Sequence, residues 1–134
     1  MPTPPERPVI LVVDDDPATA RLMELALRTT RAQVVTQHRA FGLLEAIAAH
    51  KPALVVLDVM MPGLDGPSLV QLVRADPELA RTRIVLWSAL DPGDLARRAL
   101  ACGADASLEK VVGPRAAVDR ICEWLRAWDS IELR

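Results

Sequence analysis

The chain has 134 residues, of which 51% are hydrophobic and 25% charged, and its formal net charge is only −2 at pH 7. This length predicts one domain with a real hydrophobic core, and the weak charge gives no electrostatic reason to expect a nucleic-acid partner. No apolar run approaches the ~20 residues of a membrane span, and the N-terminus lacks a signal-peptide segment. We therefore expect a cytoplasmic protein without membrane contact.

Short apolar strands alternate with helical patterns along the chain, which predicts an α/β fold of five strand–helix units with a parallel sheet. In chain order the expected elements are strand Val9–Val13, a helix from Pro17, strand Gln33–Thr36, helix Ala40–Ala49, strand Leu54–Leu57, helix Ser68–Ala75, strand Ile84–Trp87, a helix opened by Asp91 and Pro92 and closed by Gly103, strand Ala106–Glu109 and helix Pro114–Trp128. The first strand lacks polar residues, so we expect it to be central and covered on both faces.

The ends of the chain and the first helix allow further predictions. Residues 1–7 are expected to form a disordered leader, residues 8–128 the domain and residues 129–134 a short tail. The first helix is expected to begin with Asp16 as N-cap and to bury Ala18, Leu22, Leu25 and Ala26.

The last helix carries a broad apolar band, which fits either core packing or a partner surface. The members of this band are Ala117, Val118, Ile121, Trp124, Leu125 and Trp128. Cys102 and Cys122 have no paired spacing and are expected to be small core residues.

Five polar residues stand where the apolar strands stop: Asp14, Asp15, Asp58, Ser88 and Lys110. The carboxyl ends of parallel strands meet at one edge of the sheet, which is where ligands bind in open α/β sheets. Three crowded carboxylates need a cation or a basic partner, and Mg²⁺ suits an oxygen-only site. We expect Asp15 and Asp58 to be direct metal ligands.

Each of these residues also has a purely structural interpretation. The run Asp14–Asp16 could cap the following helix, and Asp58 could simply end its strand. Ser88 could cap the next turn, and Lys110 could be a solvated surface lysine. Asp65 with Gly66 is predicted to serve turn and cap chemistry.

Four motifs together resemble the bacterial response-regulator receiver domain: the run from Val12 to Asp16, the run from Leu57 to Gly66, Ser88 with Ala89, and Lys110. The resemblance spans Pro8–Trp128. It implies a flavodoxin-like doubly wound fold, (βα)5, whose parallel sheet has the strand order 2-1-3-4-5.

The resemblance also implies a phosphoryl-accepting switch rather than a metabolic enzyme. A histidine kinase or phosphotransfer protein would transfer a phosphoryl group to Asp58, with Ser88 and Lys110 contacting it. Mg²⁺ would be held by Asp15, Asp58 and the backbone carbonyl of Met60, and by Asp14 through water.

The partners implied are proteins. Because the chain ends soon after its last helix, we expect output through a downstream protein target. A homodimer through the fourth helix, the fifth strand or the fifth helix stays open.

The sequence departs from the family near Lys110. Ser107 stands where receivers commonly carry a Tyr or Phe that acts as a rotamer switch, and Val111 replaces the usual cis proline, so that bond is either trans or strained. Trp87 is interpreted as core filling or as a modified switch. Met60 and Leu90 cannot orient a hydrolytic water, so we expect slow self-dephosphorylation.

Three other functions would account for part of this pattern. Haloacid-dehalogenase-like phosphatases carry their nucleophile on the first strand, with a second acid two residues on, unlike Asp14 and Asp15. A flavodoxin needs backbone donors after the first strand, where Asp14–Asp16 would repel a phosphate. A pseudo-receiver that binds partners without phosphorylation would fit the changes at Ser107 and Val111, but all the acids of the site remain.

Overall fold

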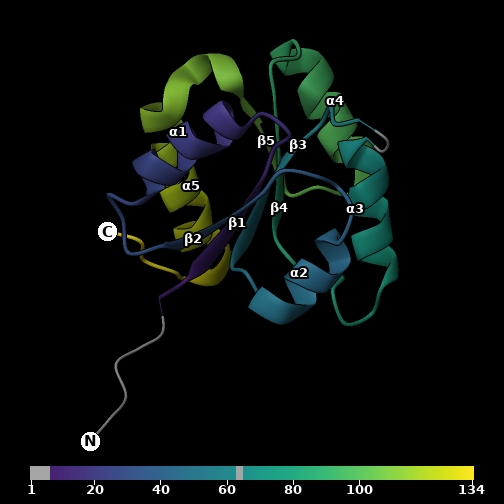
Figure 1. The fold of residues 1–134 in the computed structure, drawn as a ribbon, viewed down its shortest axis with the longest axis horizontal. Helices are drawn as coiled ribbons and strands as arrows, with labels where there is room; N and C mark the ends of the chain where they lie inside the picture. The colour runs from purple at the N-terminus through teal and green to yellow at the C-terminus, as the bar shows by residue number, and fades with distance from the viewer. Residues whose placement is uncertain (1–6, 63–64) are drawn as a thin grey trace, which may run out of the picture.

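The computed structural model describes residues 7–62 and 65–134, which form a five-stranded parallel sheet between two layers of helices (Figure 1). The elements are β1 (Val9–Val13), α1 (Pro17–Leu27), β2 (Gln33–Gln37), α2 (Leu43–His50), β3 (Leu54–Asp58), α3 (Gly66–Ala75), β4 (Ile84–Ser88), α4 (Pro92–Cys102), β5 (Ala106–Glu109), the 3₁₀ helix η1 (Lys110–Val112) and α5 (Gly113–Asp129). The strand order is β2-β1-β3-β4-β5, which confirms the predicted flavodoxin-like topology.

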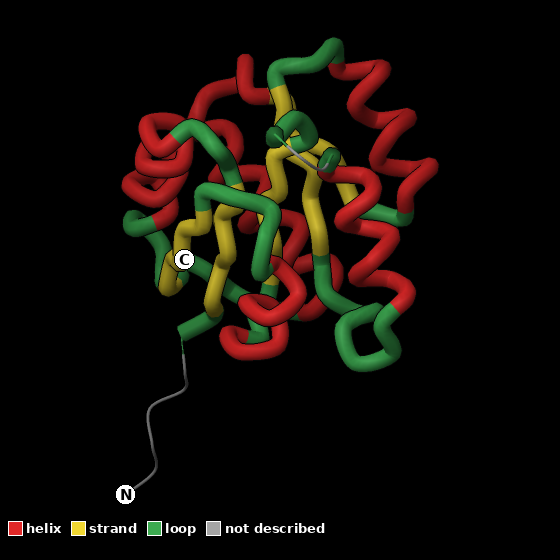
Figure 2. Tube along the Cα trace, turned by 45° about the vertical axis from the view of Figure 1, so that its right-hand side comes forward, coloured by secondary structure: helices red, strands yellow, loops and turns green. Residues whose placement is uncertain are grey.

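Helices cover both faces of the sheet, with α1 and α5 on one side and α2, α3 and α4 on the other (Figures 1 and 2). The side chains of β1 divide between the two faces. Ile10 and Val12 join the core cluster beneath α1 and α5, whereas Leu11 and Val13 join the cluster on the opposite face. All four are 0% exposed, which confirms β1 as a central strand.

Aspartates begin the helices that follow the first and third strands. Asp16 accepts a hydrogen bond from the Ala18 backbone N–H at 3.1 Å and caps α1. Asp65 accepts one from the Ser68 backbone N–H at 2.8 Å and caps α3. Both caps confirm the sequence predictions, and the N-cap of α1 is Asp16 rather than Asp14.

The buried stripe predicted for α1 is wrong except at Ala26, which is partly buried against the core. Ala20, Met23 and Leu27 face the core, whereas Leu22 and Leu25 are 56% and 45% exposed. Both sets of positions have helical spacing, so periodicity alone does not select the buried face. The face is selected by packing against β1 and α5, which the local pattern does not contain.

The second helix begins at Leu43 rather than at the predicted Ala40. Gly42 precedes it with φ +84°, a left-handed conformation that cannot continue an α-helix and that glycine adopts without strain. The Gln37 side chain donates to the backbone carbonyls of Arg39 and Phe41 and orders the turn before it.

The C-terminal residues pack onto the domain. Leu133 is 1% exposed, and its carbonyl accepts the Arg31 backbone N–H at 2.7 Å. Trp124 and Trp128 are half-buried, stack with ring centroids 5.7 Å apart, and pack against the core cluster beneath α1 and α5. These contacts account for much of the broad apolar band of α5 as core packing.

The cysteines and the N-terminal region complete the fold. Cys102 and Cys122 are free and buried, as predicted. The leader expected over residues 1–7 lies outside the described residues except for Arg7, whose guanidinium donates to the carbonyls of Arg31 and Ala32. Within the described residues, no helix has the length and apolar character needed to cross a membrane.

Gly66 allows α3 to approach the end of β3 closely, and Gly66→Ala should destabilise the fold. An added Cβ would lie 2.9 Å from the Asp58 carbonyl oxygen and 2.9 Å from the Val59 Cα. Backbone must shift to relieve this overlap, at a cost of about 1–3 kcal/mol in the free energy of unfolding, measured by urea denaturation.

Gly93→Ala is the matched control, because Gly93 also lies in the first turn of a helix. There the nearest atom to a new Cβ is the Asp91 carboxylate oxygen at 3.2 Å, which belongs to a side chain that can move. Equal losses of stability in the two variants would contradict the close-approach explanation.

Candidate functional site

Asp14 and Asp58 lie side by side at the carboxyl end of the sheet. The parallel pairing of β1 with β3 matches Val13 with Leu57, so the next residue on each strand is an aspartate. Asp14 is 0% and Asp58 4% exposed, whereas Asp15 is exposed. Carboxylate oxygens of these three acids lie within 4.8 Å of one another. The structure thus brings together the acids that the sequence singled out.

Lys110 supplies the positive charge of this cluster. Its Nζ lies 2.8 Å from Asp14 Oδ2 and 3.6 Å from Asp58 Oδ1, and its side chain is 23% exposed. Lys110 is therefore not a freely solvated lysine. It begins η1, and its peptide bond to Val111 is trans, since residues 7–62 and 65–134 contain no cis peptide bond.

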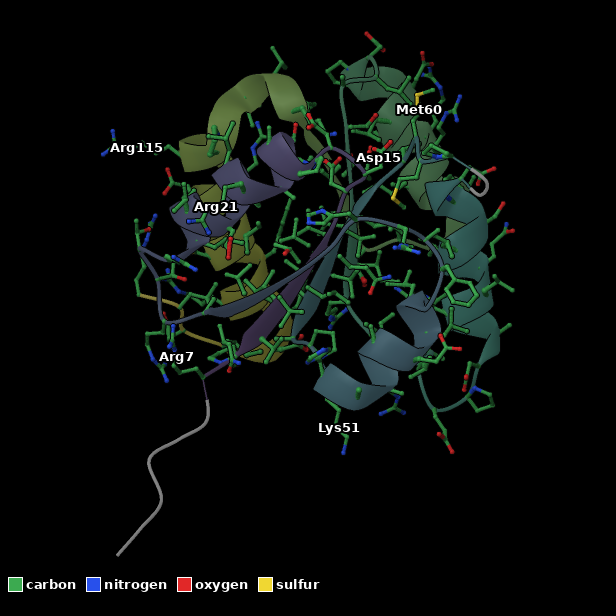
Figure 3. All side chains as sticks on the ribbon, in the orientation of Figure 1. Arg7, Asp15, Arg21, Lys51, Met60 and Arg115 are labelled. Atoms are coloured by element: carbon green, nitrogen blue, oxygen red, sulfur yellow. The ribbon has the colours of Figure 1, made fainter. Side chains whose placement is uncertain are left out.

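Ser88 and Met60 complete the set of predicted site residues. Ser88 is 3% exposed, and its Oγ accepts the Leu90 backbone N–H at 3.2 Å. The Met60 backbone N–H lies 3.3 Å from Asp58 Oδ1 and donates to it. The Met60 side chain is 65% exposed and, like Asp15, lies at the end of the sheet opposite Lys51 (Figure 3). Of the predicted loop motif, Gly63 and Leu64 lie outside the described residues.

The environment of Asp58 disfavours its charged form. Burial raises the pKa of Asp58 from 3.8 to about 6, and the neighbouring Asp14 charge acts in the same direction. The Lys110 ammonium and the Met60 backbone N–H partly oppose this rise in pKa. A bound cation would favour ionised Asp58.

Trp87 is a site residue whose contact the sequence did not reveal. Its indole N–H donates to Asp14 Oδ2 at 3.1 Å, and Lys110 Nζ lies 5.6 Å from the centre of its ring. Trp87 is 3% exposed and belongs to the core cluster beneath α1 and α5, so it does fill the core as one interpretation held. The sequence signal for this contact is that a buried indole N–H needs an acceptor, which Asp14 can provide directly after β1.

The donor set fits a small hard divalent cation. All three acids offer oxygen only, and the exposed Asp15 leaves the cluster open to solvent. Mg²⁺ prefers oxygen ligands, retains several waters and is commonly held by one or two carboxylates together with a phosphate. The arrangement can therefore hold a small cation beside two buried carboxylates and the Lys110 ammonium.

Comparison with protein families gives a match over most of the chain. The family model described as the response regulator receiver domain matches residues 10–122. The matched region contains the acids on β1 and β3 as well as Ser88 and Lys110.

Individual proteins show the same similarity. The chain is 38% identical over 123 residues to "Probable transcriptional regulator ycf27" of Cyanophora paradoxa, covering 90% of this chain and 49% of that protein. It is 35% identical over 127 residues to the transcriptional regulatory protein GltR of Pseudomonas aeruginosa, covering 93% and 52%. The chain spans about half the length of these curated relatives.

Among solved structures, the BeF₃-activated N-terminal receiver domain of Klebsiella pneumoniae RstA superposes with a TM-score of 0.79 at 33% identity. That alignment covers 88% of this chain and 98% of that one.

Asp58→Asn should stabilise the metal-free protein at neutral pH. The folded-state pKa of Asp58 is raised from 3.8 to about 6, so the fold favours the protonated carboxyl. The contribution of Asp58 to stability is therefore fully present below pH 3.8 and is lost as the pH rises through about 6. The amide carries no charge, so the free energy of unfolding of the variant should exceed that of the parent by up to about 3 kcal/mol at about pH 8 and by little at about pH 4. Urea denaturation in a chelator measures both.

Added Mg²⁺ provides the control for this prediction. It should stabilise the parent at neutral pH more than it stabilises Asp58→Asn, and so narrow the difference. A difference between the two proteins that is the same at both pH values, with or without Mg²⁺, would contradict a repelled Asp58 carboxylate.

Proposed function

The chain belongs to the response regulator receiver domain family, and from that premise we propose that it is a two-component signalling switch that accepts a phosphoryl group on Asp58. One observation carries the proposal. Asp58 is 4% exposed, has carboxylate oxygens of two further acids within 4.8 Å, and its Oδ1 lies 3.6 Å from Lys110 Nζ. A carboxylate in these surroundings is poised to react with a negatively charged electrophile, such as a phosphoryl group, when a cation is bound beside it.

The proposed step is an in-line phosphoryl transfer. A carboxylate oxygen of Asp58 forms a bond to phosphorus while the P–N bond of a phosphohistidine breaks, and the imidazole leaves on the donor protein. Lys110 lies close enough to neutralise charge on the transferred group. Ser88 Oγ accepts from Leu90, so its own hydroxyl hydrogen can donate to a phosphoryl oxygen.

Mg²⁺ is the proposed cofactor. We assign Asp15, Asp58 and the Met60 backbone carbonyl as direct ligands and Asp14 as a ligand through water. Bound Mg²⁺ would supply positive charge for the phosphoryl oxygens and relieve the repulsion between the acids. Asp14 suits the indirect role because its carboxylate is already bonded within the protein by three donors.

The proposed partners are proteins of the cytoplasm. The donor is a histidine kinase or phosphotransfer protein, and the output goes to a downstream protein or through a homodimer that uses α4, β5 or α5. Leu100 on α4 and Val111 after β5 are each 85% exposed and offer apolar surface for such contacts.

To transmit the phosphorylation of Asp58 to this surface, the chain would need a mechanism other than the Tyr or Phe rotamer switch that is common in the family. Ser107 pairs with Leu86 on one face of the sheet, whereas Trp87 pairs with Leu108 on the other. Trp87 is therefore not positioned as a substitute for the missing aromatic at Ser107.

Incubation with acetyl phosphate and Mg²⁺ should add ~80 Da to the chain, the mass of one phosphoryl group, as measured by intact mass spectrometry. Asp58→Asn lacks the nucleophile and should show no adduct. Lys110→Ala should retain the nucleophile but react far more slowly, because charge on the transferred group is no longer neutralised.

Asp119→Asn serves as the control, since Asp119 is an exposed acid of α5 outside the acidic cluster. It should be phosphorylated like the parent. An unmodified parent chain would overturn the proposed function, and an adduct that survives in Asp58→Asn would place the acceptor elsewhere.

The phosphorylated protein should lose its phosphoryl group slowly, over minutes or longer. Met60 is exposed beside the acceptor and Leu90 is half-buried near Ser88, and neither side chain can orient a water. Met60→Asn introduces a polar group and should shorten the lifetime by about tenfold, measured as loss of the mass adduct.

Leu72→Asn is the matched control, because Leu72 is an exposed apolar residue of α3 away from the acids. It should leave the lifetime unchanged. A parent lifetime of seconds in buffered Mg²⁺ would refute the assignment of Met60 and Leu90 as inert neighbours.

A further inference from the structure

We propose that Trp87 is a positioning residue of the phosphoryl site, which sets the Asp14 carboxylate and the Lys110 ammonium in place for Asp58. The inference deepens the proposed function and rests on it for the chemistry that the site performs. Its structural part, the indole contact with Asp14, can be tested without phosphorylation.

The Asp14 carboxylate is held from several directions. Its Oδ1 accepts the Asp16 backbone N–H at 2.9 Å, and its Oδ2 accepts both the Trp87 indole N–H at 3.1 Å and the Lys110 ammonium at 2.8 Å. Asp14 is 0% exposed, so water does not replace a donor that is lost. The indole N–H on Oδ2 and the Asp16 backbone N–H on Oδ1 together fix the orientation of this carboxylate, to which Lys110 then binds.

The indole also affects how strongly Lys110 binds Asp14 relative to Asp58. Lys110 Nζ lies 2.8 Å from Asp14 Oδ2 but 3.6 Å from Asp58 Oδ1. Because the indole N–H already neutralises part of the charge on Asp14 Oδ2, the lysine is bound there less tightly. The centre of the Trp87 ring lies 5.6 Å from Nζ and adds a weak attraction for the ammonium.

Trp87 is itself firmly placed. It is 3% exposed, packs in the core cluster with α1 and α5, and precedes Ser88 in β4. It pairs with Asp58 on one side and with Leu108 on the other. One residue of the central sheet thus connects the positions of Asp14, Ser88 and Lys110 with the packing of two helices.

The contact can be tested by NMR of indole N–H groups in the metal-free, ¹⁵N-labelled chain. Trp124→Phe and Trp128→Phe assign the three indole signals by elimination. We expect the Trp87 proton to exchange most slowly with solvent, and to shift both in Asp14→Asn and on addition of Mg²⁺ to the parent. The Trp124 and Trp128 signals should stay in place.

Kinetics with acetyl phosphate test the functional part. Trp87→Phe keeps a ring beneath Lys110 but deletes the N–H donor, and it should slow phosphorylation at saturating Mg²⁺ by about three- to tenfold, the range for one lost hydrogen bond. Trp87→Leu deletes donor and ring and should be slower still. Trp128→Phe is the matched control, because Trp128 stacks on Trp124 rather than on the site, and it should react like the parent.

The two measurements separate the failure of this inference from the failure of the proposed function. A Trp87 indole signal unaffected by Asp14→Asn and by Mg²⁺ would overturn the positioning role, as would Trp87→Phe that reacts as fast as the parent. A parent that takes no phosphoryl group while its Trp87 signal shifts with both changes would overturn the proposed function and support Trp87 as the residue that positions Asp14.

Discussion

Carboxylate oxygens of Asp14, Asp15 and Asp58 lie within 4.8 Å of one another at the carboxyl end of the sheet, two of these acids being almost completely buried. Such an arrangement is unfavourable without compensation, because like charges in a low-dielectric setting repel strongly. The fold supplies that compensation through Lys110 and Trp87, which both reach Asp14, and through the Met60 backbone N–H at Asp58. The remaining repulsion makes the site receptive to a cation.

The topology explains why these groups can meet. Parallel pairing brings the ends of β1, β3, β4 and β5 to one edge, and the register places Asp14 directly beside Asp58 and Ser88 opposite Glu109, one residue before Lys110. Helices on both faces bury the strands, so the backbone that carries the acids is held rigidly. Gly66 lets α3 begin close against the end of β3. Burial and register together thus fix the geometry of a charged edge that neither would fix alone.

Much of this could be read from the sequence because it depends on local pattern. The alternation of apolar strands and helices predicted the α/β sheet, the polar residues after each strand predicted which side chains converge, and Asp65 was identified as a cap. Features that depend on long-range packing were not predictable. Leu22 and Leu25 have the spacing of a buried stripe but are exposed, because the phase of α1 is set by β1 and α5. The hydrogen bond from Trp87 to Asp14 joins β4 to the residue that follows β1, and these two strands are not adjacent in the sheet.

We propose that Asp58, rather than a neighbouring acid, receives the phosphoryl group. Reduction of the phosphorylated chain with borohydride converts an aspartyl phosphate to homoserine, and peptide mass spectrometry then locates the modified position. We expect homoserine at position 58 and unchanged aspartate at positions 14 and 15. Homoserine at either of those positions, or its absence from position 58 in a chain that carries the adduct, would contradict the assignment.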